Sequence, residues 1–196
     1  MKIISGKYKG RNIIGFDIVG TRPTMDRVKE SLFAMIQNYI DNSNCLDLFA
    51  GSGNLGLEAM SEGASACTFI DSNKVAVKTI NENLAKLNIE NGKVYLKDFR
   101  TFLKETNDKY SLIFIDPPYK TSFIKDALIL IERYDLLIDN GLVILESDSK
   151  DKLIYSDYYS VLKERKFGDK FILILTNRRR KIQEETVARY SFSLPL

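Results

Sequence analysis

The chain of 196 residues carries 29 basic and 26 acidic residues, for a formal net charge of +3, and 44% of its residues are hydrophobic. This composition predicts one globular domain with a small appendage, and the absence of a long apolar run excludes a membrane-spanning helix. The chain has no histidine, which excludes Ser-His-Asp hydrolysis, Cys-His proteolysis and most metal-hydrolase chemistries.

The first forty residues hold the excess of positive charge. They contain seven bases and three acids, a net of +4, while the remainder of the chain is close to neutral. Such asymmetry is typical of an end that faces nucleic acid. The same segment lacks the apolar run and cleavage site of a signal peptide, so we expect a cytoplasmic protein.

This basic segment predicts a small hairpin followed by a helix. Two short strands, Lys2–Ser5 and Arg11–Ile14, flank a turn that contains glycine. A loop follows, and the helix after it has Thr24 as its N-cap residue. The apolar face expected for this helix consists of Val28, Leu32, Met35, Ile36 and Tyr39.

From residue 44 onward, short apolar strands alternate with amphipathic helices. Strands are predicted over Cys45–Phe49, Ala66–Asp71, Lys93–Leu96, Leu112–Asp116 and Leu142–Glu146. Helices are predicted over Asn54–Glu62, Asn73–Leu87 and Ser122–Tyr134. Two final strands, Tyr158–Lys166 and Lys170–Thr176, turn at Gly168 and Asp169 as an antiparallel pair. The pattern predicts an α/β fold, with a mostly parallel sheet covered on both faces and an antiparallel edge pair.

Two cysteines lie beside the first two strands of this region. Cys45 and Cys67 are too few for a disulfide framework or a zinc site, so we expect both to be small buried apolar residues.

A glycine-rich turn follows the first of these strands, in the run Asp47–Gly56. Its glycines match the pattern G-x-G-x-x-G, and Asp71, twenty residues after Gly51, could accept hydrogen bonds from a ribose diol. Dinucleotide-binding enzymes share these features. The additional acid Asp47, in the pattern D-x-F-x-G-x-G, resembles the S-adenosylmethionine site of class I methyltransferases. The segment Lys97–Phe99 then resembles the one that holds adenine, although Asp98 also fits an ordinary solvated loop.

The fourth strand of this region ends in Asp116-Pro117-Pro118-Tyr119. Proline fixes its own φ and restricts the residue before it, so a carboxylate, a carbonyl and an aromatic ring are held together at the strand end. This set suits methylation of an exocyclic amine, whose two N–H groups Asp116 and the Pro117 carbonyl can bind. Tyr119 can stack on the base. Methylation at cytosine C5 would instead require a cysteine here.

Four segments together resemble the RsmD family, bacterial enzymes that form N2-methylguanine in small-subunit (16S) ribosomal RNA. They are Ile3–Arg11, Thr21–Phe33 with its Thr-Arg-Pro-Thr motif, Asp47–Glu58 and Asp116–Tyr119. The resemblance covers residues 1–176 and implies a Rossmann-like class I fold with a seven-stranded sheet. It implies S-adenosyl-L-methionine contacts by Asp47, Ala50, Gly51, Ser52, Gly53, Asp71, Asp98 and Phe99, and catalysis by Asp116, Pro117, Pro118 and Tyr119. Asp71 departs from the glutamate expected there.

An RNA partner gives the basic N-terminal residues a role. Arg22 and Thr24 could meet the cofactor carboxylate or an RNA phosphate at the start of their helix. A path for RNA could be lined by Lys7, Lys9, Arg11, Arg27 and Lys29, although each lysine taken singly also fits a solvated surface. The target guanine must be unstacked, so a loop nucleotide is expected.

These patterns divide the chain into an RNA-facing appendage over 1–40, a methyltransferase domain over 41–176 and a basic tail over 177–196. The tail contains Arg178–Lys181, which fits either RNA binding or a solvated helix start. We expect a monomer that acts on ribosomal RNA or the small subunit, without membrane or metal. Three alternatives remain. The first is an adenine-N6 or cytosine-N4 amino-methyltransferase that acts on DNA or RNA, and the second is a non-catalytic RNA-binding assembly factor. The third is a nucleotide-dependent oxidoreductase, which leaves the Pro-Pro motif without a role.

Overall fold

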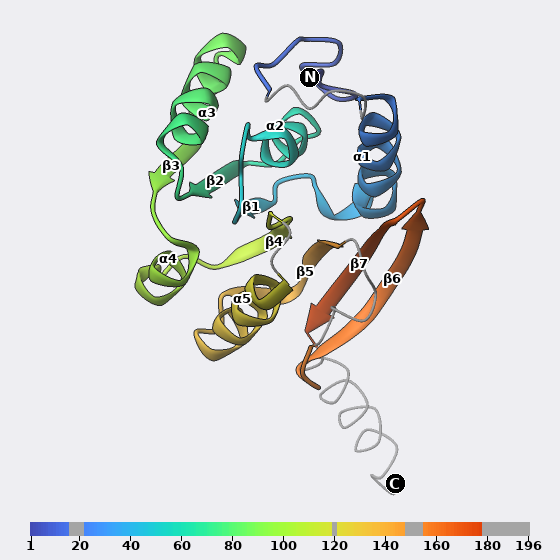
Figure 1. Cartoon of the computed structure of the whole chain (residues 1–196), viewed down its shortest axis with the longest axis vertical. Helices are drawn as coiled ribbons and strands as arrows, with labels where there is room; N and C mark the ends of the chain where they lie inside the picture. Colours follow the sequence, from blue (N-terminus) through green and yellow to red (C-terminus); the bar gives the residue numbers. More distant parts are fainter. Residues whose placement is uncertain (16–21, 119–120, 148–154, 178–196) are drawn as a thin grey trace, which may run out of the picture.

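The structure, a computed structural model, describes residues 1–15, 22–118, 121–147 and 155–177, with backbone only for 22–25 and 121. Its sheet has seven strands in the order β3-β2-β1-β4-β5-β7-β6 (Figure 1). Strands β1 to β5 run parallel, whereas β7 is antiparallel to both β5 and β6. The strands are β1 Asn44–Asp47, β2 Ala66–Asp71, β3 Gly92–Leu96, β4 Tyr110–Ile115, β5 Leu137–Ser147, β6 Tyr159–Phe167 and β7 Lys170–Asn177. The predicted sheet is confirmed.

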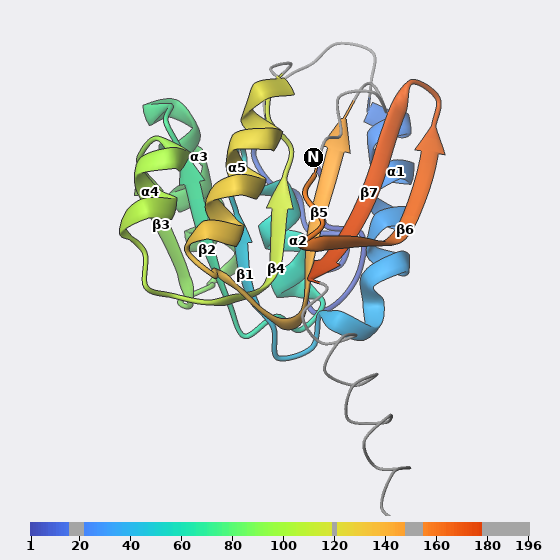
Figure 2. The same cartoon turned by 90° about the horizontal axis from the view of Figure 1, so that it is seen from below.

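Helices cover both faces of the sheet (Figures 1 and 2). One face packs against α1 (Arg22–Ile36), α2 (Asn54–Ser61) and α3 (Lys74–Leu87). The other packs against α4 (Phe99–Glu105) and α5 (Thr121–Arg133). Side chains of a strand alternate between the faces, so Leu112 and Phe114 of β4 join the first cluster, and Ile113 and Ile115 join the second. Among the described helices, none has the length and apolarity needed to cross a membrane.

Several predicted elements differ from the observed ones in extent. Helix α1 begins at Arg22, so Thr24 lies inside its first turn and the predicted N-cap is wrong. The apolar face predicted for α1 also differs at two residues. Tyr39 is exposed in a short 3-10 turn after the helix, whereas Phe33, which was not predicted to lie on this face, is buried. The expected hairpin strands are reduced to one bridge, between Lys2 and Asn12.

The helix α4 was not predicted, because seven residues are too few to show a helical period. Strand β5 starts at Leu137, earlier than expected, since its first part carries exposed residues rather than an apolar run. Both cysteines are buried and free, as predicted. Burial raises the pKa of the Cys45 thiol to about 12, which keeps this thiol protonated.

The strand order reverses between β1 and β4, which pair in parallel. In open α/β sheets, ligands bind outside the carboxyl ends of the strands at such a switch point. The glycine-rich turn follows β1 and the Asp-Pro-Pro motif follows β4, and the two strands are in register at Asp47 and Phe114. The backbone N–H of Leu48 donates to the carbonyl of Phe114 at 3.1 Å. The two motifs therefore lie side by side.

Candidate active site

Asp47, which is buried beneath the glycine-rich turn and only 2% exposed, stabilises this turn. Its Oδ2 accepts a hydrogen bond from the backbone N–H of Gly56 at 3.0 Å. Burial raises the pKa of Asp47 to about 7, with the Gly56 N–H opposing that shift and the negative charge of Asp71 adding to it. Gly53 has a φ of 81° as the N-cap of α2, a conformation that favours glycine. Asp47 therefore fixes the turn to the start of α2.

Asp71 connects the same turn to the next helix. Its carboxylate accepts from the backbone N–H of Gly51 at 2.9 Å and of Asn73 at 2.8 Å. Beside these bonds, Ala50 donates to the carbonyl of Ile70 at 3.0 Å. A carboxylate has about four lone-pair sites, so these two bonds leave capacity for further donors. Asp71 is thus a shared support of the turn and a candidate acceptor for ligand hydroxyls.

Asp98 and Phe99 occupy the third strand end, where they also organise α4. The Asp98 side chain is the N-cap of this helix and accepts two backbone N–H groups, at 2.9 and 3.3 Å. Phe99 is 4% exposed, and its ring centroid lies 4.8 Å from that of Phe49 and 5.3 Å from that of Phe123. Arg100 covers the Phe99 ring at 4.5 Å. The sequence had not pointed to Phe49 or Phe123, because aromatic residues are ordinary core candidates.

Asp116 directly follows β4 and remains accessible to solvent, as does Pro118, while Pro117 is half-buried. Partial desolvation by the neighbouring protein atoms raises the pKa of Asp116 to about 7. The negative charge of Glu146 adds to the rise, and the positive charge of Lys170 opposes it. Tyr119, the last member of the motif, lies outside the described residues.

Two charged residues that the sequence analysis did not single out lie next to this site. Glu146 is near the carboxyl end of β5, the strand beside β4, and its Oε1 forms an ion pair with the Nζ of Lys170 at the start of β7. The sequence did contain a signal for Glu146, because it is an acid near the end of an apolar strand, as Asp71 is for β2 and Asp116 for β4. The strand order was needed to show that it adjoins Asp116.

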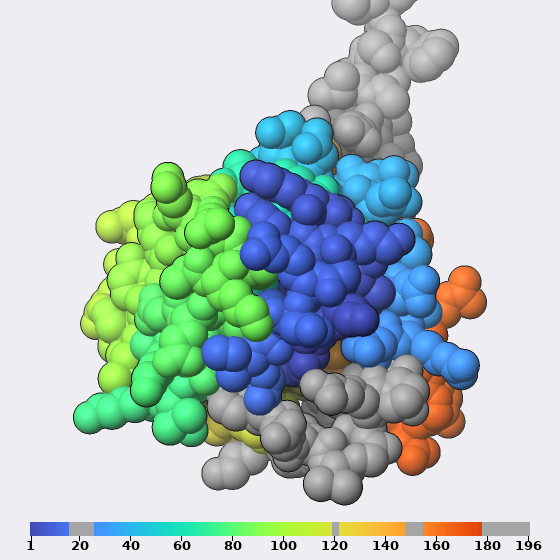
Figure 3. All heavy atoms as spheres, turned by 90° about the horizontal axis from the view of Figure 1, so that it is seen from above, coloured from blue at the N-terminus to red at the C-terminus, as the bar shows by residue number. Residues whose placement is uncertain are grey.

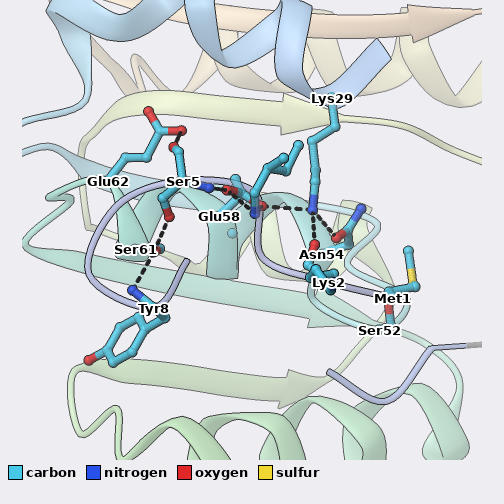
Figure 4. Close-up of polar contacts among 12 residues, drawn as sticks. Met1, Lys2, Ser5, Tyr8, Lys29, Ser52, Asn54, Glu58, Ser61 and Glu62 are labelled. Atoms are coloured by element: carbon cyan, nitrogen blue, oxygen red, sulfur yellow. Dashed lines mark hydrogen bonds and ion pairs between the residues drawn. The ribbon is translucent and has the colours of Figure 1, made fainter. Parts of the chain in front are cut away.

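The N-terminal segment, residues 1–15, is bonded to α2 through Glu58, which is fully buried (Figure 4). Its carboxylate accepts from the backbone N–H of Ile4 at 2.9 and 3.1 Å and of Ser5 at 2.9 Å. Lys29 of α1 completes the site, with its Nζ 2.7 Å from Glu58 Oε2. Every strong acceptor position thus meets a donor, which a buried charge requires.

Lys29 does not line an RNA path, which corrects one expectation. Its side chain is 3% exposed and also donates to the carbonyl of Lys2 at 2.9 Å and to Asn54 Oδ1 at 2.7 Å. An ammonium group so placed bonds inside the protein and cannot reach an external phosphate. The side chains of Arg22 and Thr24 lie outside the described set. The other bases of the expected path are exposed: Lys7, Lys9, Arg11 and Arg27.

The N-terminal segment spreads over the middle of the α1–α3 face, between α3 and α1 (Figure 3). Asn83 of α3, fully buried, joins it to the glycine-rich turn. Asn83 Oδ1 accepts from the N–H of Ile14 at 2.7 Å, and its Nδ2 donates to the carbonyls of Ile14 at 2.9 Å and Ser52 at 3.0 Å. A hollow of about 340 Å³ lies between the N-terminal segment and α1, lined among the described residues by Met1, Lys2, Asn12 and Asp26.

The chain is similar to known proteins in both sequence and structure. The family model described as Conserved hypothetical protein 95 matches residues 1–176. The protein named Ribosomal RNA small subunit methyltransferase D from Buchnera aphidicola of Acyrthosiphon pisum is 37% identical, over 83% of this chain and 86% of its own. Its namesake from Escherichia coli K12 is 35% identical, over 78% of this chain and 77% of its own. The solved structure of yhhF from Escherichia coli is 31% identical with a TM-score of 0.83, covering 90% of this chain and 97% of that one.

Proposed function

This chain belongs to the Conserved hypothetical protein 95 family, and we propose that it transfers a methyl group from S-adenosyl-L-methionine to the N2 amine of a guanine in small-subunit (16S) ribosomal RNA. One observation carries the proposal: the glycine-rich turn after β1 and the Asp-Pro-Pro motif after β4 lie on paired, parallel strands at the switch point of the sheet. A cofactor held by the first motif can therefore face an amine held by the second.

The residues of the first site fit S-adenosyl-L-methionine, which supplies an electrophilic methyl group on a sulfonium. Asp71 has acceptor capacity for the ribose hydroxyls. Asp98 is exposed beside the aromatic group of Phe49, Phe99 and Phe123, an arrangement that suits an adenine ring with its amine. The methionine part would lie against the turn itself, along Ala50, Gly51, Ser52 and Gly53, which Asp47 supports.

At the second site, the chain binds and polarises the amine. Its lone pair is delocalised into the base, so the nitrogen is a poor nucleophile until it becomes more tetrahedral. Asp116 and the Pro117 carbonyl would each accept one N–H group, which favours that geometry and stabilises the developing positive charge. Tyr119, which lies outside the described residues, is the residue that we propose to stack on the base, as the sequence predicts. The departing proton goes to Asp116 or to water.

The proposed reaction is tested by its product. The protein is incubated with labelled S-adenosyl-L-methionine and unmodified 16S ribosomal RNA or small subunits, and the RNA is digested to nucleosides. We expect N2-methylguanosine. N6-methyladenosine or N4-methylcytidine would replace the proposal with the corresponding amino-methyltransferase, and the absence of any methylated nucleoside would favour a non-catalytic assembly factor.

A pH dependence follows from the raised pKa of Asp116. The carboxyl is protonated below about 7 and ionised above it, and only the ionised form is a full acceptor for the amine. We therefore expect kcat/KM to rise with pH through about 7 and to level off above it, in single-turnover assays. The pKa of Asp47 has nearly the same value, so its titration could produce the same pH dependence. Asp47→Asn is therefore the control, and in this variant the rate should still rise with pH through neutrality. A rate independent of pH across neutrality would contradict the acceptor role.

Salt dependence tests the RNA-facing role proposed for the exposed bases of the N-terminal segment. Contacts with phosphates release counterions, so each lost contact lowers the slope of log affinity against log salt by roughly 0.7 to 0.9. Lys7→Ala and Arg11→Ala are therefore each expected to weaken RNA binding and to reduce this slope by roughly 0.7 to 0.9. Lys93→Ala, an exposed base on β3, is the matched control. Unchanged affinity and slope in both variants would place the RNA elsewhere.

We further propose that the protein works as a monomer in the cytoplasm, in ribosomal RNA processing. The basic tail after residue 177 lies outside the described residues, so its binding to RNA stays a prediction. The same holds for the division into an appendage over 1–40 and a catalytic domain, although residues of both share one hydrophobic cluster.

A further inference from the structure

Three charged residues lie in a row along the carboxyl edge of the sheet. Asp116, Glu146 and Lys170 belong to the ends of β4, β5 and β7, which are consecutive in the strand order. Leu145 pairs with Ile115, so Glu146 lies beside Asp116, while Glu146 itself pairs with Ile172 on β7.

The three side chains also share one face. Phe114, Ile144 and Ile172 all pack in the cluster under α1, α2 and α3. Each member of the row is two residues away from one of these along its strand, and side chains two apart in a strand point the same way. The ion pair between Glu146 and Lys170 agrees with this placement. The row therefore presents an acceptor, an acceptor and a donor, in that order.

We propose that Glu146 and Lys170 recognise the Watson–Crick edge of the target base and select guanine, with Glu146 accepting the N1–H and Lys170 donating to O6. This inference rests on the proposed function, in which Asp116 holds the N2 amine. The guanine edge presents, in order, the N2 amine as donor, N1–H as donor and O6 as acceptor. That order is complementary to the row of side chains.

The other amino bases do not fit this row. In adenine and cytosine the ring nitrogen next to the amine is an acceptor, N1 or N3, so it would meet the Glu146 carboxylate with lone pair against lone pair. A site built around a hydrogen bond rejects strongly an analogue that cannot form it, because a buried polar group is then left unpaired. Glu146 has a side chain only 14% exposed, so water does not readily replace the missing donor.

The ion pair is compatible with base binding. A carboxylate offers about four lone-pair sites, so Glu146 can accept a further hydrogen bond beside its ion pair with Lys170, and an ammonium with three N–H donors can serve more than one acceptor. Adjacent strands are about 4.8 Å apart, a distance that the long side chains of Glu146 and Lys170 can bridge to converge on one base. The pair holds both groups in place before the base arrives, which favours recognition.

The test uses 2-aminopurine, which has the same N2 amine as guanine but an unprotonated N1 and no O6. The methylated guanine is first mapped with the wild-type protein, and small-subunit RNA with 2-aminopurine at that position is then prepared. The wild type should prefer guanine. In Glu146→Gln, the amide N–H can donate to the N1 of 2-aminopurine, so the guanine preference in kcat/KM should fall about ten- to a hundredfold.

Lys170→Met gives an independent result. At a pH well above 7, where Asp116 is ionised, it should slow methylation of guanine by roughly tenfold and of 2-aminopurine much less, since the analogue has no O6 to lose. Glu90→Gln, at an exposed position between α3 and β3, is the matched control. It should change neither the rate on guanine nor the preference for guanine over 2-aminopurine. Binding of S-adenosylhomocysteine and thermal unfolding verify that each variant is folded, and if Glu146→Gln does not fold, Lys170→Met decides the outcome.

The two possible failures are distinct. If the wild type forms no N2-methylguanosine, the proposed function is wrong. If it forms this product, but the folded variants keep the wild-type preference for guanine over 2-aminopurine, the base is recognised elsewhere and this inference is overturned.

Discussion

Replacing Asp116 with alanine is expected to lower the methyl-transfer rate at least roughly a hundredfold, the usual scale for removing one preorganised electrostatic group. The carboxylate is one of two acceptors proposed for the amine, and it carries the negative charge that offsets the charge developing on the nitrogen. The residue lies after β4 and is accessible, so its removal leaves no cavity in the core. Single-turnover rates with saturating RNA measure the loss in the chemical step.

The matched control for this variant is Asp108→Ala, which removes an exposed aspartate at the other end of β4. It should leave the rate unchanged. Asp116→Asn keeps an acceptor oxygen but loses the charge, so its rate should lie between those of the wild type and the alanine variant. Titration with S-adenosylhomocysteine should give similar affinities for all four proteins. Near-normal turnover in Asp116→Ala would remove this residue from the mechanism.

Replacing Glu58 with alanine is expected to reduce the free energy of unfolding by about 3 to 5 kcal/mol. The change leaves the buried ammonium of Lys29 without its ionic partner, and it leaves the N–H groups of Ile4 and Ser5 without their acceptor. For a domain of this size, such a loss lowers the melting temperature by roughly 10 °C. Thermal and urea unfolding, monitored by circular dichroism, measure it.

Two variants bracket this result. Lys29→Met leaves Glu58 with its two backbone donors and should be less destabilising than Glu58→Ala. Glu82→Ala removes an exposed glutamate of α3 that lies 3.8 Å from Lys78, a pair worth at most about 0.5 kcal/mol. A loss below about 1 kcal/mol in Glu58→Ala would mean that the buried site contributes little to holding the N-terminal segment.

The bonds of Glu58, Lys29 and Asn83 connect the segment proposed to face RNA with the turn proposed to hold the cofactor. Lys29 contacts Asn54, the first residue of α2 after the turn, and Asn83 contacts the carbonyl of Ser52 within it. The N-terminal segment is therefore packed against the structure that forms the proposed cofactor site. Loss of this segment would disturb both the proposed RNA-facing surface and the proposed cofactor site.

Much of the site followed from local sequence patterns. The tight turn at Gly51 and Gly53, both with positive φ, and the abrupt end of β4 before Pro117 depend on neighbours within a few residues, so residue type predicted them. The strands and the long helices were found for the same reason, since an apolar run or stripe records which face is covered.

The tertiary structure alone decided which charges are inside and which strand ends meet. A lysine on an amphipathic helix reads as solvated, and only the buried Glu58 of another helix makes the interior position of Lys29 favourable. Glu146 and Lys170 became neighbours of Asp116 through the strand order, which places β5 and β7 beside β4 across long sequence separations. Local patterns specify the conformation of the backbone, whereas the partner of a charge is set by residues far away in the sequence.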